Sequence, residues 1–294
     1  MDMRDETARP GIGRVQRLQV LRSVPMGLIL GHPESEVLLP TRNVPANAAI
    51  GDWLEVFVHG DSEDRPIATT ERPIAQVGEF ARLVVVSVGA HGAFLDWGLA
   101  KDLLLPFPLQ RERVRPGESV VVRVLLDEVS GRPIATAKLE RFLEDPPADL
   151  REGQAVELLL YEETDLGTKA IVDGRFGGLL YFEPGREAPA VGAFETGYVQ
   201  RIRKDGKVDL TLTPTGRAAV ENARDVVLEA LARSGGRLGL SDASPPEAIR
   251  RTLGLSKKAF KRAIGALYRE RRIRIGEDST ESVGPLGSPR GERD

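Results

Sequence analysis

The residues best suited to binding a ligand are lysines and arginines near the C-terminus. From Lys257 to Arg274 the chain has eight basic residues and a single acid, Glu270. Such a run can be merely the solvated face of a helix. Here it spans a predicted helix and the strand after it, two elements that can lie along a phosphate backbone, so we predict nucleic-acid contact. No Asn or Gln stands at a clear reading position, which favours phosphate contact over base recognition. The predicted contacts are Lys257, Lys258, Lys261, Arg262, Arg269, Arg272 and Arg274.

Residues for catalysis or metal binding are scarce. The chain has no cysteine, which excludes disulfides, thiolate metal sites and a cysteine nucleophile. Its histidines, His32, His59 and His91, lie where no helix would pair them with an acid, so we predict no metal. No phosphate-binding loop, dinucleotide fingerprint, nucleophile elbow or His-Glu-x-x-His motif occurs. We predict a protein without catalytic residues, cofactor or small-molecule substrate; an RNA-processing enzyme is a minority alternative that no residues support.

An internal repeat organises the first 216 residues. Alternating apolar residues in its middle copy predict short strands separated by turns, and five short strands favour a closed barrel of the oligonucleotide-binding (OB) type, since closure removes exposed sheet edges. Each copy has two leucines, a third residue and, eleven positions later, a glycine: 38–40 and Gly51, 104–106 and Gly117, 179–181 and Gly192. Two copies share Arg-Pro-Ile-Ala-Thr, at 65–69 and 132–136. The predicted strands of the middle copy are at about 81–88, 93–97, 103–105, 119–126 and 133–137.

The middle copy resembles the RNA-binding module named after ribosomal protein S-one. The resemblance rests on Gly-x-x-Gly-Ala-Phe-Leu-Asp-Trp at 89–97, Leu-Leu-Pro-Phe at 104–107 and Arg-Pro-Gly-Glu at 115–118. That module ordinarily has a histidine after the leucines of its third strand, where this chain has Pro40, Pro106 or Tyr181. No copy therefore has the standard binding face. The first copy, with almost no aromatic residues, is predicted to be a spacer or packing module.

Rings and cations in the second and third copies are the candidates for binding a single strand, because bases stack on aromatic side chains while cations follow the phosphates. Alternation places Phe94 and Trp97 on opposite sides of one strand, so one of them is expected to be exposed. For any single ring, core packing is the alternative. The candidates are Phe94, Trp97, Lys101 and Phe107 in the second copy and Lys169, Arg175, Tyr181, Phe182, Arg201 and Arg203 in the third.

After residue 216 the apolar period changes from two to about 3.6, which predicts helices in the order of a winged helix-turn-helix domain. The third helix is expected to bury an apolar stripe that includes Tyr268, and strand-like alternation returns after it. The expected boundaries are a helix ending at Gly235-Gly236, a strand at 238–240, a second helix capped by Ser244 and ended by Gly254, and a third helix capped by Ser256.

The string Gly-Leu-Ser-Lys-Lys-Ala-Phe-Lys-Arg-Ala-Ile-Gly-Ala-Leu-Tyr at 254–268, following three such barrels, is similar to the bacterial conserved virulence factor B family. The resemblance spans residues from about 12 to 276. It implies three S-one-type modules, a winged helix, RNA binding and a regulatory role. We predict a mainly β protein with an α+β C-terminal domain. Its parts are three tandem five-stranded OB barrels at 12–75, 76–145 and 150–216, a winged helix at 217–276 and a disordered tail at 277–294.

The formal net charge of −3 conceals a strong division along the chain. Residues 217–276 carry 14 Lys/Arg against 6 Asp/Glu (+8), residues 277–294 carry 2 against 5 (−3), and residues 1–216 therefore carry −8. A polyanion responds to local positive charge. No apolar segment suits a membrane span or a signal sequence, so we expect a cytoplasmic protein. We predict non-catalytic binding of single-stranded RNA in post-transcriptional regulation; the alternatives are a duplex-DNA transcription factor and a protein-interaction scaffold on ribosome or polymerase subunits.

Overall fold

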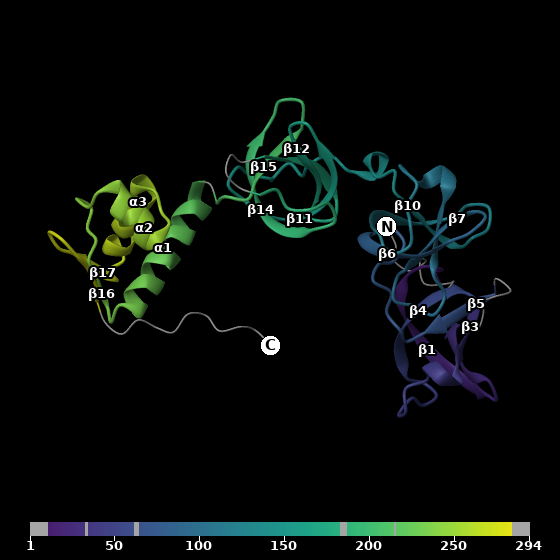
Figure 1. Cartoon of the computed structure of the whole chain (residues 1–294). Helices are drawn as coiled ribbons and strands as arrows, with labels where there is room; N and C mark the ends of the chain where they lie inside the picture. The colour runs from purple at the N-terminus through teal and green to yellow at the C-terminus, as the bar shows by residue number, and fades with distance from the viewer. Residues whose placement is uncertain (1–10, 33–34, 62–64, 183–186, 215, 284–294) are drawn as a thin grey trace. The chain divides into compact units, whose positions relative to one another are not determined.

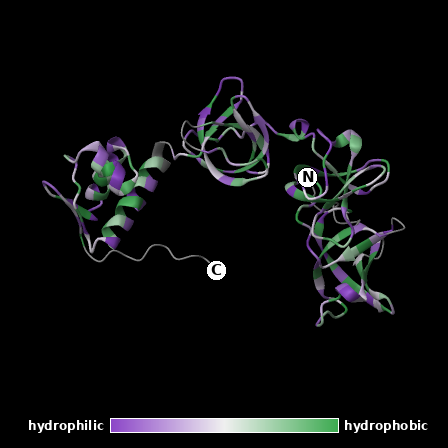
Figure 2. Ribbon diagram, in the orientation of Figure 1, coloured by the Kyte–Doolittle hydropathy of each residue, from purple (hydrophilic) through white to green (hydrophobic). Residues whose placement is uncertain are grey.

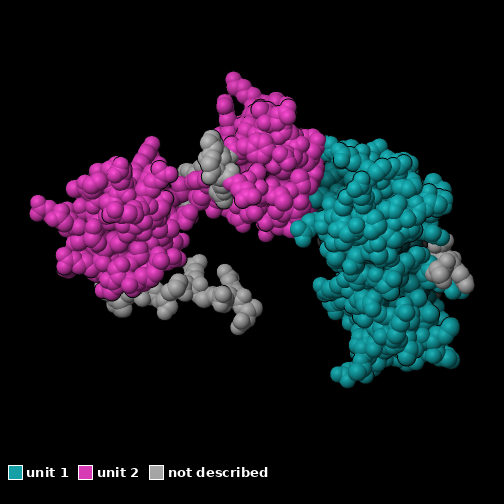
Figure 3. Space-filling view, viewed as in Figure 1, with its two compact units in different colours: residues 1–143 teal, residues 144–294 magenta. Residues whose placement is uncertain are grey.

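The structure is a computed structural model that describes residues 11–32, 35–61, 65–182, 187–214 and 216–283 (Figure 1). The chain divides into two compact units, residues 1–143 and 144–294 (Figure 3). Three closed barrels are followed by a domain of three helices and a three-stranded sheet. The predicted fold class, three tandem five-stranded OB-type barrels and a winged helix, is therefore confirmed.

All three barrels have the same strand order, in which the third and fifth strands pair in parallel and the other pairs are antiparallel. Barrel 1 consists of β1 (Val15–Val24), β2 (Gly27–His32), β3 (Ser35–Pro40), β4 (Trp53–Gly60) and β5 (Pro66–Thr69). Barrel 2 consists of β6 (Phe80–Val88), β7 (Gly92–Asp96), β8 (Leu103–Pro106), β9 (Ser119–Leu126) and β10 (Pro133–Thr136). Barrel 3 consists of β11 (Ala155–Thr164), β12 (Gly167–Val172), β13 (Phe176–Tyr181), β14 (Phe194–Ile202) and β15 (Val208–Thr211).

Each barrel requires a glycine at the first residue of its second strand. A Cβ atom at Gly27, Gly92 or Gly167 would lie 2.0, 2.2 or 2.1 Å from the carbonyl oxygen of the third strand. No side chain fits at that distance, so the position admits only glycine. Hydrophobic and hydrophilic residues both occur along the strands (Figure 2), and every barrel has its own apolar core.

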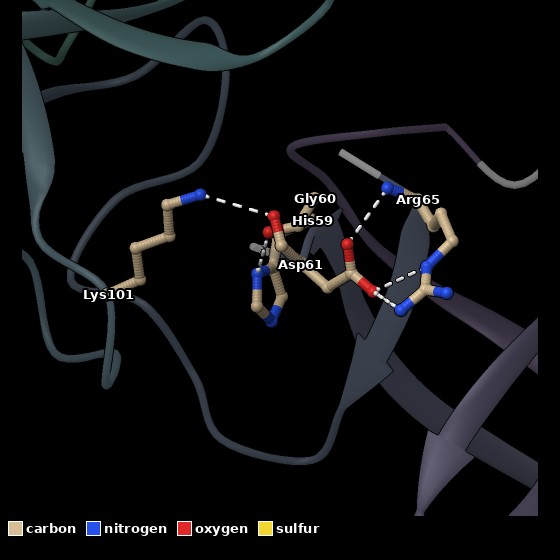
Figure 4. A network of polar contacts seen from close by, with 5 residues as sticks. All are labelled: His59, Gly60, Asp61, Arg65 and Lys101. Atoms are coloured by element: carbon tan, nitrogen blue, oxygen red, sulfur yellow. Dashed lines mark hydrogen bonds and ion pairs between the residues drawn. The ribbon is translucent and has the colours of Figure 1, made fainter. Parts of the chain in front are cut away.

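Barrels 1 and 2 pack against each other and form one unit. Phe57 of β4 is buried among the core residues of barrel 2, where its ring meets Trp97 edge-on at 5.5 Å between centroids. Backbone contacts join the barrels as well, because the Val77 N–H donates to the Gly13 carbonyl at 2.8 Å. Lys101 Nζ donates to the Asp61 carbonyl at 3.3 Å (Figure 4). The junction therefore combines an apolar contact with polar bridges.

The C-terminal domain consists of α1 (Gly216–Arg233), β16 (Arg237–Leu238), α2 (Pro246–Leu253), α3 (Lys257–Arg269), β17 (Ile273–Ile275) and β18 (Thr280–Ser282). Gly254 ends α2 with a φ of 69°, as expected of a helix-terminating glycine. Ser256 caps α3, its side chain accepting from the Ala259 N–H at 3.2 Å. Both predicted boundaries are confirmed.

Three details of this domain differ from the sequence-based expectation. Pro245 occupies the N-cap of α2, while the Ser244 hydroxyl accepts from the Ser241 N–H at 2.9 Å, so Ser244 closes a turn instead of capping the helix. The strand expected at 238–240 covers only 237–238. Residues 277–283 do not belong to a tail, because β18 pairs with both β16 and β17 and is the central strand of the sheet. The remainder of the expected tail, 284–294, lies outside the described residues.

In the described part of the chain, no helix has the length and hydropathy needed to cross a bilayer.

Candidate nucleic-acid interface

One row of outward-facing residues allows the three barrels to be compared at equivalent positions. It crosses strands two, three, five and four of each barrel in hydrogen-bonded register. In barrel 1 the row is Ile29, Leu38, Ile67 and His59, in barrel 2 it is Phe94, Leu104, Ile134 and Leu125, and in barrel 3 it is Lys169, Leu179, Asp209 and Arg201. The row is apolar or uncharged in barrels 1 and 2 and charged only in barrel 3. Within this row, the charged side chains that could contact phosphates are therefore confined to barrel 3.

The rings of barrel 2 are occupied by the protein itself. Trp97 is 4% exposed, and its indole N–H donates to the Lys101 carbonyl at 2.7 Å. The prediction that Trp97 stacks on bases is wrong, because Trp97 shares the inward side of the strand with buried Leu95 and packs against Phe57 of barrel 1. Phe94 is half-buried against Gly89, and the Arg113 guanidinium lies 3.9 Å from the centroid of the Phe107 ring. A base could stack on this face of Phe107 only by displacing Arg113.

Barrel 3 brings Tyr181, Arg201 and Arg203 together around Asp209. Arg203 donates to the Tyr181 hydroxyl and, from Nε, to Asp209 Oδ2 at 3.0 Å, and the hydrogen bond with Asp209 raises the pKa of Arg203. Arg201 lies opposite Asp209 in register and is exposed. A shallow hollow beside Tyr181 and the 41%-exposed Phe182 adds apolar surface. We call the surface formed by Lys169, Tyr181, Phe182, Arg201 and Arg203 the barrel-3 face.

Two predicted cations of barrel 3 are engaged in ion pairs. Lys169 belongs to the barrel-3 face, but its Nζ is 2.7 Å from Glu162 Oε2, so a phosphate would compete with that carboxylate. Arg175 lies at the opposite end of the β12–β13 hairpin from Tyr181. Its guanidinium is 2.8 Å from the Glu144 carboxylate, and its carbonyl accepts from the Glu144 N–H at 3.0 Å. The structure therefore separates Arg175 from the predicted cluster and places it against the segment that precedes barrel 3.

Helix α3 presents a cationic surface directly opposite its buried side. Phe260, Ala263, Ile264 and Leu267 are buried in the core of the domain. The 3.6-residue period turns positions 258, 262 and 269 to the other side, with 261 on its flank. These side chains are exposed and no acid occurs within the helix, although Lys261 Nζ lies 3.7 Å from Asp242 Oδ2 outside it. Lys257 is half-buried at the first position of the helix. We call Lys258, Lys261, Arg262 and Arg269 the α3 face.

The strands after α3 are less basic than the sequence run indicates. Arg272 and Arg274 are exposed, but Arg274 lies in register with Glu281, which also pairs with Arg237 at 3.3 Å. The turn between β17 and β18 carries the exposed acids Glu277 and Asp278. The positive potential of the domain is therefore concentrated on α3 and declines toward the wing.

Sequence reasoning missed two features of this surface. Tyr268, expected on the apolar stripe, is 57% exposed, because a residue eight positions after Phe260 is rotated by about 80° from it. Arg250 and Arg251 form a basic last turn of α2, and both are exposed. The adjacent arginines before Gly254 were the available signal, since cations favour helix C-termini.

Comparison with known proteins agrees with this architecture. Residues 225–281 match the family model of the CvfB-like winged helix domain, and residues 12–71 match that of the S1 domain. The uncharacterized protein YitL of Bacillus subtilis is 28% identical over 285 residues, which cover 92% of each chain. Conserved virulence factor B of Staphylococcus aureus is 23% identical over 235 residues, covering 77% of this chain and 78% of the relative. These matches support the resemblance of the chain to the conserved virulence factor B family.

A solved structure is similar as well. It is a multidomain protein with nucleic acid binding domains from Streptococcus pneumoniae, 21% identical, covering 93% of this chain and 99% of that one, with a TM-score of 0.43. The two family models describe nucleic-acid-binding or regulatory modules, and they support a chain built from nucleic-acid-binding domains.

The S1 match falls on barrel 1, whose outward row is apolar or uncharged. The match thus reports the fold of the barrel and not the charge of its surface.

Within the described residues, no group of three His, Asp or Glu side chains is placed to hold a metal ion.

Proposed function

We propose that this protein binds single-stranded RNA without catalysis, using the α3 face and the barrel-3 face, and acts in post-transcriptional regulation. The observation that carries the proposal is the α3 face: four exposed cations on a helix that contains no acid. When such a surface neutralises phosphates, the counterions condensed on the nucleic acid are released. This release favours binding even though the chain has a net charge of −3. We expect the protein to act in the cytoplasm.

The acidic wing favours a single strand over a duplex. A winged helix that docks on duplex DNA lays its recognition helix in the major groove, with neighbouring elements close to the phosphates. Here Glu277 and Asp278 at the tip of the wing would face the phosphates of such a duplex. A flexible single strand can follow α3 and avoid the wing. Tyr181 and Phe182 of barrel 3 offer rings for unpaired bases, which a duplex does not provide.

The test is a titration of the full chain with a mixed-sequence single-stranded RNA of about 20 nucleotides, long enough for more than one module. The variant neutralises Lys258, Lys261 and Arg262 to Gln. Its matched control neutralises Arg17, Arg115 and Lys138, three exposed cations of barrels 1 and 2, and changes the net charge equally. Loss of three phosphate contacts should reduce the slope of log K against log salt by about 2 for a single strand. The control should keep both the affinity and the slope of the wild type.

Equal affinity of the α3 variant and its control would show that α3 does not hold the RNA. A wild-type preference for duplex DNA of the same length would favour the transcription-factor alternative. If the wild type binds neither nucleic acid, the scaffold alternative is favoured, and co-purification with a protein partner becomes the next measurement.

A further inference from the structure

Gly265 lies in the interior of α3, where glycine is the least favourable residue after proline. Its φ is not in the left-handed region, and a Cβ atom built there would have no neighbour within 4 Å among the described residues. Other glycines of the same unit have evident packing reasons. A Cβ at Gly178 would lie 2.6 Å from Leu210 Cδ1, and one at Gly197 would lie 2.4 Å from Leu158 Cδ1. The fold therefore explains Gly178 and Gly197 but does not explain Gly265.

The four helical neighbours of Gly265 are all exposed and suited to a nucleotide. Positions three and four residues away lie next to a residue on a helix surface. For Gly265 these are Lys261, Arg262, Tyr268 and Arg269. Three cations and one 57%-exposed ring thus surround a patch of bare helix backbone. Because Gly265 has no side chain, an anionic group has room to approach the helix backbone closely between these cations.

Arg269 is already held beside this patch. Its Nε donates to the Gly265 carbonyl oxygen at 3.2 Å, which lays the side chain back along the helix toward Gly265. The bond fixes part of a flexible side chain before any ligand arrives, which reduces the entropy lost on binding. An alanine at 265 would leave this bond in place, because its Cβ would not come within 4 Å of the Arg269 side chain.

We propose that Gly265 is a docking position for one phosphodiester of the bound strand, which approaches the bare backbone between Arg262 and Arg269 while Tyr268 stacks on an adjacent base. The inference rests on the proposed function and assigns the point of closest contact on α3. Arg262 and Arg269 are seven residues apart, or about 10 Å along the helix, so both guanidinium groups can reach a phosphate between them. A side chain at 265 would occupy the space that this phosphate needs.

The experiment compares Gly265→Ala and Gly265→Leu with the wild type in the full chain, using the RNA titration described above. Both substitutions favour the helix, so the thermal stability of the winged-helix domain should rise or stay equal. RNA affinity should nevertheless fall about threefold for Ala and about tenfold or more for Leu. The control pair is Gly239→Ala and Gly239→Leu, because Gly239 is equally open in the same domain but lies outside α3. The control pair should bind RNA as the wild type does.

The outcomes separate the inference from the function on which it rests. Wild-type affinity in both Gly265 variants, together with loss of affinity in the Lys258/Lys261/Arg262 variant, would overturn the inference and leave the proposed function standing. Wild-type affinity in that cation variant would refute the role of α3 itself. Equal losses in the Gly265 and Gly239 pairs, or losses matched by lower thermal stability, would show a general structural effect and would also overturn the inference.

Discussion

Replacing Trp97 by alanine should loosen two barrels at once without weakening RNA binding directly. The side chain is 4% exposed, and Phe57, its edge-on partner from barrel 1, is 1% exposed. Truncating a buried aromatic residue of this kind costs about 3–5 kcal/mol. Part of that cost belongs to the Trp97–Phe57 pair, and a double-mutant cycle with Phe57→Ala should give a coupling of about 0.5–1.5 kcal/mol. The indole N–H bond to the Lys101 carbonyl is lost as well.

Hydrogen exchange of the full chain, resolved by peptide, measures the loss of stability separately in each barrel. Peptides from β7, which leads to Trp97, and from β4, which contains Phe57, should both lose protection in Trp97→Ala. Peptides from barrel 3 serve as an internal control, because they belong to the other compact unit. A local reading is needed because a chain of several domains does not unfold in one transition.

Two results would refute this reasoning. If β7 loses protection and β4 does not, the ring contact does not couple the two barrels. If exchange is unchanged while RNA affinity falls, Trp97 contacts RNA after all and its burial is not what keeps the barrels together.

Three further predictions concern other sites. Burial lowers the pKa of His59 below its ordinary 6.5; the Gly60 carbonyl and Glu71 oppose this effect, while Lys101 and Arg42 add to it. Barrels 1 and 2 should therefore lose stability as pH falls from about 6.5 through the lowered folded pKa, and His59→Gln should flatten the pH dependence of their melting temperature between about pH 7.5 and pH 5.5. Gly178→Ala should destabilise barrel 3 by about 1–3 kcal/mol, seen as faster exchange in β13, because its Cβ would meet the Leu210 side chain. Tyr181→Ala should reduce RNA affinity by about 1–3 kcal/mol if a base stacks there, whereas Tyr181→Phe, which keeps the ring, should lose much less in the same titration.

The barrels could be predicted from the sequence because the repeat preserves the same order of apolar strands and turns in its copies. The glycine that opens each second strand recurs because a carbonyl oxygen of the third strand lies about 2 Å from where its Cβ would be. The position of Trp97 could not be predicted in the same way. Alternation separates Phe94 from Trp97 but does not say which side faces the interior, and the deciding neighbour, Phe57, comes from another barrel.

The binding surface was only partly predictable, because a basic residue in a sequence does not reveal its partners. Arg175 forms an ion pair with Glu144, which precedes barrel 3, and Lys169 forms one with Glu162 of the adjacent strand. Both pairs form only when the barrel folds. On α3 the prediction was better, since a helix fixes its neighbours by sequence spacing alone. Even there, the exposure of Tyr268 follows only when its angular position on the helix is measured from buried residues such as Phe260. The acids Glu277 and Asp278 can be assigned to the tip of the wing only once β18 is known to pair with β17.

Inward and outward positions of the three barrels have different constraints, and this difference supports the proposed barrel-3 face. The interior must close a five-stranded barrel, so its glycines and apolar residues recur in all copies. The outward row keeps a leucine on the third strand of every copy, Leu38, Leu104 or Leu179. Its other positions differ in the third copy, and charge is present only in the copy that ends at Arg201. A barrel can therefore match the S1 family model and still have no charge in this row, as barrel 1 does. Transferring the charged row into barrel 2, as Phe94→Lys with Leu125→Arg, should leave its core intact and add RNA affinity at low salt, because the row lies outside that core.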